Sequence, residues 1–191
     1  MKKITVFVMI MVLMLSVASC SGKHYRGPFE TYGRFTVKLD KKTNAKEAMA
    51  RYWKWSGDPN DTVISVPEYC TDDIRITAIG GLSKSGGDPR TPFEVEVDPG
   101  TFSHINATEN SSPIDMVFTI EVGKDIQHVF FKSQDPLVLK DSDGQDVRYE
   151  VYYYFVCDPD NPTYYSKDGK LYSKRTNKLE SNVPEHFYKS V

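Results

Sequence analysis

The chain has 191 residues, a length that suits a single domain with a small extension. Its 24 lysines and arginines and 26 aspartates and glutamates give a formal net charge of −2, which argues against a nucleic-acid partner, because such partners require a basic surface. A charged fraction of 26% and an aromatic fraction of 13% indicate a folded globular protein and exclude a disordered tail.

The beginning of the chain has the pattern of a secretory signal peptide. Two lysines precede an apolar run over residues 4–18, which is too short for a comfortable membrane span. The segment ends in Val17-Ala18-Ser19-Cys20, which resembles the lipobox of bacterial lipoproteins. In that class the signal is cleaved just before the cysteine, which then carries acyl chains such as palmitate. The resemblance implies that residues 1–19 are removed and that Cys20 is lipidated and anchors the protein in a membrane.

Residues 20–33 are expected to form a lipidated tether of small, basic and aromatic residues. Ser21 follows the cysteine, as in enterobacterial lipoproteins that are sorted to the outer membrane. Residues 22–26 lack the acidic run that directs some lipoproteins to the cell surface. These resemblances imply a place in the cell envelope, on the periplasmic face of the outer membrane. Residues 34–191 are expected to form one mostly β domain.

The first predicted elements of that domain are a strand over residues 35–39 and an amphipathic helix over residues 44–56. Asn44 and Glu47 have the spacing of a capping box at the start of this helix. Gly57 suits its end. Apolar residues recur at spacings of three and four, as on one face of a helix: Ala45, Ala48, Met49, Tyr52 and Trp53.

The rest of the chain predicts strands separated by turn residues. Alternating apolar and polar residues mark most of these segments: 63–66, 74–78, 93–97, 114–122, 126–132, 137–139 and 147–157. This spacing predicts a mainly β fold, an antiparallel β-sandwich of the immunoglobulin-like, Greek-key type, with the helix at an edge or an end. An open antiparallel sheet with the helix on one face is the alternative.

A hairpin is predicted near the C-terminus. Tyr164-Tyr165 and Leu171-Tyr172 flank Lys167-Asp168-Gly169-Lys170, which suits a type I′ turn. The surrounding stretch, residues 160–184, contains Asn161-Pro162 and Asp168-Gly169 and resembles a hairpin segment of BspA-like surface proteins. The leucine-rich repeats of that family are missing from this sequence. The resemblance therefore implies a hairpin and an envelope setting, and not the architecture of the family.

Cys70 and Cys157 remain as a pair if Cys20 carries lipid. An exported chain permits a disulfide between them, which would close a loop of roughly 87 residues. Two buried free thiols are the alternative, since cysteine packs as a small hydrophobic residue.

Asp141, Asp143 and Asp146 surround Gly144 and form the best candidate for a metal site. Carboxylates grouped in this way could bind Ca²⁺, which prefers oxygen ligands. The same residues are also typical of a turn between two strands, and this interpretation is favoured. No other cofactor is indicated.

Three aromatic residues are candidates for ligand binding. Trp55 lies off the predicted apolar face of the helix, and Tyr152 and Tyr154 lie on the strand face opposite Tyr153. Aromatic rings on an exposed surface could stack on sugars or contact a protein partner.

These observations favour a non-catalytic binding, adhesive or structural module in the envelope, with an envelope protein or a glycan as its partner. A glycan-binding module requires Trp55 to share an exposed face with Tyr152 or Tyr154. A small envelope hydrolase would assemble its site from polar loops over residues 80–90, 101–113 and 141–146. A pocket with a histidine and carboxylates would favour the hydrolase, and a flat aromatic surface would favour the binding module.

Overall fold

The computed structural model describes residues 29–39, 46–71, 73–82, 90–108 and 112–189. Nearly all regular structure within them is β-strand, which confirms the mainly β class. The signal peptide, Cys20 and the tether up to residue 28 lie outside the described residues. The described part of the chain contains no helix with the length and apolar character that a membrane span requires.

The first main sheet is built around β3 (Glu47–Trp55), which pairs antiparallel with β2 and parallel with β6 and β9. A separate pair is formed by β7 (Gly81–Leu82) and β8 (Arg90–Thr91). The other strands of the first sheet are β1 (Phe29–Tyr32), β2 (Phe35–Leu39), β5 (Tyr69–Thr71), β6 (Ile74–Ile79), β9 (Glu94–Val97) and β11 (His128–Val129).

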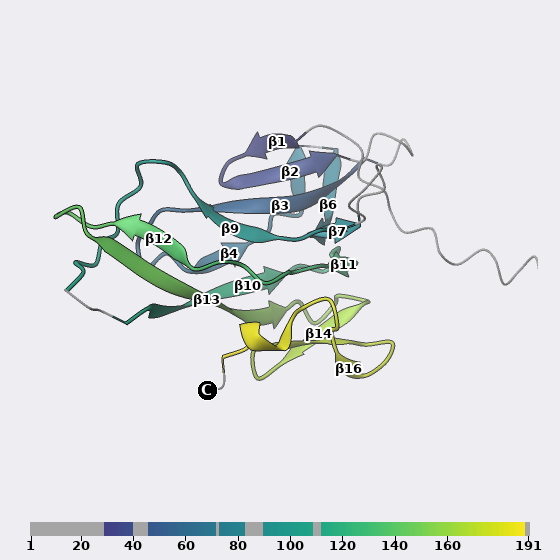
Figure 1. Cartoon of the computed structure of the whole chain (residues 1–191). Coiled ribbons are helices and arrows are strands. Elements are labelled where there is room, and N and C mark those ends of the chain that lie inside the picture. The colour runs from purple at the N-terminus through teal and green to yellow at the C-terminus, as the bar shows by residue number, and fades with distance from the viewer. Residues whose placement is uncertain (1–28, 40–45, 72, 83–89, 109–111, 190–191) are drawn as a thin grey trace, which may run out of the picture.

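The second main sheet has the strand order β12-β13-β10-β4. Its two long central strands run parallel and in register from Ile114↔Tyr149 to Val122↔Cys157. Figure 1 shows this sheet below β3 and β9 of the first sheet. The bounds of its strands are β4 (Val63–Ser65), β10 (Ile114–Val122), β12 (Leu137–Lys140) and β13 (Asp146–Cys157).

Aromatic side chains join the two main sheets. The ring of Trp55 meets the rings of Phe118 and Tyr149 edge-on, at centroid distances of 5.5 and 5.0 Å, and Trp53 meets Phe118 at 5.8 Å. Edge-to-face pairs at such distances contribute beyond the area that they bury. All four side chains are buried, so the core lies between the facing sides of these sheets.

A third sheet lies at the end of the chain and contains β14 (Tyr164–Lys167), β15 (Lys170–Ser173) and β16 (Lys178–Leu179). The predicted hairpin is confirmed: Asp168 and Gly169 both have positive φ, as a type I′ turn requires. Gly169 also packs against the ring of Tyr154 so closely that an added Cβ would lie 2.2 Å from it. A short 3₁₀ helix, η1 (Glu185–Phe187), follows and places Phe187 against Tyr153.

The predicted helix over residues 44–56 is wrong where the structure describes it, because residues 47–55 form β3. Tyr52, Trp53 and Trp55 are residues that favour strands. Neighbouring strands on both edges satisfy the backbone of β3, and a bulge between Ala48 and Met49 allows consecutive residues to be buried. The spacing of three and four in this segment was therefore coincidental.

The expectation of antiparallel pairing is also wrong at the centre of both main sheets. The pairs β10–β13, β10–β4, β3–β6, β3–β9 and β6–β11 are all parallel. Parallel neighbours need long crossover connections, and a pattern of alternating residues does not reveal which strands such connections join. The sequence also predicted that a tether extends to residue 33, but Phe29–Tyr32 form β1 and pair with β2.

Candidate functional site

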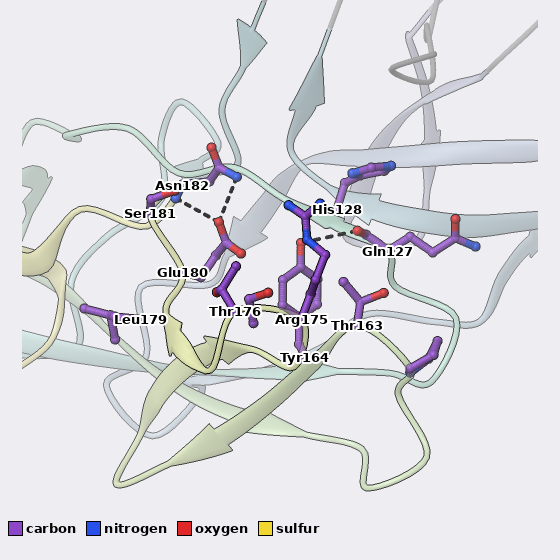
Figure 2. A pocket seen from close by; sticks show the side chains of 12 residues that line it. Gln127, His128, Thr163, Tyr164, Arg175, Thr176, Leu179, Glu180, Ser181 and Asn182 are labelled. Carbon is purple, nitrogen blue, oxygen red and sulfur yellow. Dashed lines mark hydrogen bonds between the residues drawn. The ribbon is translucent and has the colours of Figure 1, made fainter. Parts of the chain in front are cut away.

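A cleft of about 620 Å³ lies between the third sheet and the segment that leads into β11, and we call it the hairpin cleft (Figure 2). Its volume lies within the range of sites that hold small molecules. Polar side chains dominate its walls. The lining residues are Gln127, His128, Pro162, Thr163, Tyr164, Ser173, Arg175, Thr176, Leu179, Glu180, Ser181 and Asn182.

Asn161 holds the two sides of the hairpin cleft together. Its side chain is fully buried, and its Nδ2 donates hydrogen bonds of 2.8 Å to the carbonyl oxygens of Gly123 and Ile126. Its Oδ1 accepts hydrogen bonds from the backbone N–H groups of Thr163 and Tyr164, at 2.8 and 2.7 Å. This one amide therefore fixes the start of the third sheet against the loop that precedes β11.

Tyr164 gives the cleft a rigid floor. Its side chain is buried, and its hydroxyl donates a hydrogen bond of 3.2 Å to the carbonyl oxygen of Gln127. Figure 2 shows this bond across the cleft. Burial raises the pKa of the Tyr164 hydroxyl far above its usual value, so the group stays protonated at physiological pH.

The turn between β15 and β16 forms one wall of the cleft. It is held in place by hydrogen bonds of Lys174, which does not line the cleft. Lys174 donates from Nζ to the carbonyl oxygens of Pro159 and Asn161, at 3.2 and 2.6 Å. Its backbone N–H donates to the carbonyl oxygen of Thr163 at 2.8 Å. The neighbouring residue, Arg175, is exposed and lines the cleft.

Glu180 is the unusual residue of the cleft because it is a charged residue of which only 9% is exposed. Its Oε1 accepts both the backbone N–H and the side-chain Nδ2 of Asn182, at 3.1 and 2.8 Å. Its Oε2 has no partner among the described residues, and neither has the guanidinium of Arg175. Oε2 is not fully buried, so it can accept a hydrogen bond from water or from a ligand that enters the cleft.

No motif in the sequence connects the residues that line the hairpin cleft. His128 was expected in a strand, which is confirmed, and Glu180 and Arg175 lay in the stretch that resembles a hairpin segment. Long-range contacts bring them together: Asn161 bonds to the loop before β11, and the N–H of Phe131, after β11, donates to the carbonyl oxygen of Asn182.

The candidate calcium residues form a turn and do not converge. Asp141 is buried, and its carboxylate accepts the backbone N–H groups of Ala107 at 2.6 Å, Asp143 at 3.0 Å and Gln145 at 2.8 Å. Asp146 pairs with Lys140 at 2.5 Å. Within the described ranges, no group of three or more histidine, cysteine or acidic side chains is arranged to hold a metal ion. The turn interpretation fits this geometry, and no Ca²⁺ site is proposed.

The Asp141 turn makes a prediction about pH. Hydrogen bonds from the N–H groups of Ala107, Gln145 and Asp143 hold the pKa of Asp141 below its ordinary value of 3.8. The resulting stabilisation is fully present above pH 3.8 and is lost as the pH falls through the lower pKa of the folded state. We expect Asp141→Asn to lower the Tm by about 5 °C at pH 7. The difference from the wild type should shrink below pH 3.8 in thermal scans, and Asp143→Asn, at an exposed position, should leave the Tm unchanged.

Cys70 and Cys157 are free thiols in the structure, so the expected disulfide is not formed. They lie on different sheets. Cys70, on β5, donates to the carbonyl oxygen of Ile74, and Cys157 ends β13 beside Ser166. Burial raises the pKa of both thiols, that of Cys157 to about 11, so neither is a reactive thiolate at physiological pH.

The three aromatic candidates do not share a surface. Trp55 is buried, with 2% exposed, and its Nε1 donates to the carbonyl oxygen of Asp58 at 2.9 Å, so it is a core residue and not a ligand-binding residue. Tyr152 and Tyr154 lie on the outer face of β13, where Val156 is also exposed. The shared aromatic face that glycan binding required is therefore not formed.

Comparisons of the chain with models of protein families, with curated proteins and with solved structures found no match.

Proposed function

We propose that this protein is a lipid-anchored component of a bacterial cell envelope, attached through Cys20 to the periplasmic face of the outer membrane. The proposal is supported by Val17-Ala18-Ser19-Cys20, by the apolar run before it and by Ser21 after it. We also infer that the two main sheets form a β-sandwich, because Trp55 on one sheet contacts Phe118 and Tyr149 on the other. Its parallel central pairs distinguish this sandwich from the immunoglobulin type.

The function that the geometry supports best is the binding of a small polar ligand in the hairpin cleft. One observation carries this proposal: Glu180, of which only 9% is exposed, lines a cleft of about 620 Å³, and one of its carboxylate oxygens has no partner among the described residues. Asn161 and Tyr164 hold the walls without needing a ligand, so the site is largely formed in advance. Such an anchored module would retain its ligand near the membrane.

A second candidate function is a small envelope hydrolase, which is favoured by the presence of His128 and Glu180 in the same cleft. A histidine could transfer protons during hydrolysis. The two functions are separated by His128→Gln: a hydrolase would lose turnover and keep its affinity, whereas a binding protein has no turnover to lose.

The membrane anchor is tested by Cys20→Ala. We expect this variant to move from the membrane fraction to the soluble fraction and to lose label from radioactive palmitate, because acyl chains supply the membrane affinity. Cys70→Ala is the matched control and should stay in the membrane fraction with its label. Retention of Cys20→Ala in washed membranes would contradict the lipoprotein assignment.

A further inference from the structure

We propose that the hairpin cleft binds a short zwitterionic peptide, whose ammonium group meets Glu180 and whose carboxylate meets Arg175. This inference rests on the proposed binding function of the cleft and names its ligand class. Two opposite charges line the same cleft, and neither has an ionic partner among the described residues. A ligand that carries both complementary charges satisfies both at once.

The negative end of the site is Glu180. Asn182 occupies Oε1 with two hydrogen bonds and so fixes the orientation of the carboxylate. Oε2 is left to accept a hydrogen bond from the ligand. The ligand group that suits this oxygen is a cationic donor, because hydrogen bonds between charged partners are stronger than neutral ones and the burial of Glu180 strengthens them further.

The positive end of the site is Arg175, which lies on the turn between β15 and β16. The planar guanidinium matches the geometry of a carboxylate and can donate two parallel hydrogen bonds to it. Figure 2 shows Arg175 and Tyr164 among the lining side chains, with Glu180 and Asn182 on another side of the cleft. Arg175 and Glu180 form no ion pair with each other, so the two ends remain available to a ligand between them.

The volume of the hairpin cleft favours a peptide over a single amino acid. A cleft of about 620 Å³ has the size of sites that hold drug-sized molecules. Hydroxyl groups of Thr163, Ser173 and Thr176 line it and can bond to peptide groups, while Pro162 and Leu179 offer apolar contacts for a side chain.

The test is calorimetric titration of the full chain, purified in detergent, with alanyl-alanine and with two blocked forms. N-acetylation removes the ammonium group, and C-terminal amidation removes the carboxylate. We expect each block to weaken binding by at least about tenfold. Free alanine should bind more weakly than the dipeptide. Equal affinities of the wild-type protein for the free and the blocked dipeptides would overturn the proposal.

Two variants test which residue binds each end of the ligand. Glu180→Gln keeps an oxygen for Asn182 and should remove the preference for the free amine over the acetylated form. Arg175→Gln should remove the preference for the free carboxylate over the amide. Glu185→Gln and Arg148→Gln are exposed controls outside the cleft and should change neither preference.

A neutral sugar, the disaccharide of N-acetylglucosamine, separates this inference from the function on which it rests. If the sugar binds in a manner that depends on Glu180 while the dipeptide does not bind, the ligand class is wrong and the binding function stands. If neither the peptides nor the sugar bind, the zwitterion proposal is overturned and the cleft loses its support as a ligand site.

Discussion

Replacing Trp55 with alanine is expected to lower the free energy of unfolding by about 4 kcal/mol. The indole is buried between the two main sheets, where it meets Phe118 and Tyr149 edge-on and donates a hydrogen bond to the carbonyl oxygen of Asp58. Alanine would leave a cavity that the paired strands on both sides cannot fill. Chemical denaturation at equilibrium measures this change.

Trp55→Phe is the control for this prediction. Phenylalanine keeps most of the ring and loses the hydrogen bond to Asp58, so the expected cost is about 1.5 kcal/mol. If Trp55→Ala were as stable as the wild type, the side chain would have to lie on the surface, as the glycan hypothesis supposed.

Replacing Asn161 with alanine is expected to lower the free energy of unfolding by about 3 kcal/mol. The substitution removes two hydrogen bonds to the carbonyl oxygens of Gly123 and Ile126 and two from the N–H groups of Thr163 and Tyr164. Because Asn161 is fully buried, water cannot easily replace these partners. Denaturation curves should shift accordingly.

The same variant connects stability with function. Without the amide of Asn161, the third sheet is no longer fixed to the loop before β11, and the walls of the hairpin cleft separate. Ligand binding should therefore weaken together with stability. Asn106→Ala, at an exposed loop position with one side-chain hydrogen bond to Ser142, should change neither. Full ligand affinity in a destabilised Asn161→Ala protein would show that the site lies elsewhere.

The local features of the fold could be predicted from the sequence. The hairpin over β14 and β15 depends on Asp168 and Gly169, whose positive φ angles belong to a turn of adjacent residues. The long strand β10 depends on the alternation of Met116, Phe118 and Ile120, all of which are buried. In both cases neighbouring residues carry the whole signal.

The features that were predicted wrongly depend on contacts between residues far apart in the sequence. Ala48, Met49 and Ala50 are compatible with a helix, and only β6 on one side and β2 on the other make them a central strand. Trp55 was assigned to the surface because the helical period placed it there, whereas the strand period places it with Trp53 in the core.

The candidate site was missed for the same reason. Its floor and walls come from segments separated by about 35 residues or more, which are joined by Asn161, by Tyr164 and by the backbone bond from Phe131 to Asn182. None of the three is part of a recognisable motif. The carboxylate of Glu180 becomes notable only when the partners of each of its oxygens are known.

The most direct test of the hairpin cleft as a ligand site is nuclear magnetic resonance of the isotope-labelled full chain during titration with alanyl-alanine. We expect saturable shifts of backbone signals concentrated at Gln127, Thr163, Arg175 and Glu180, and weaker ones in Glu180→Gln. Saturable shifts centred on another surface, such as the outer face of β13 around Tyr154, with the signals of the cleft unmoved, would contradict this expectation.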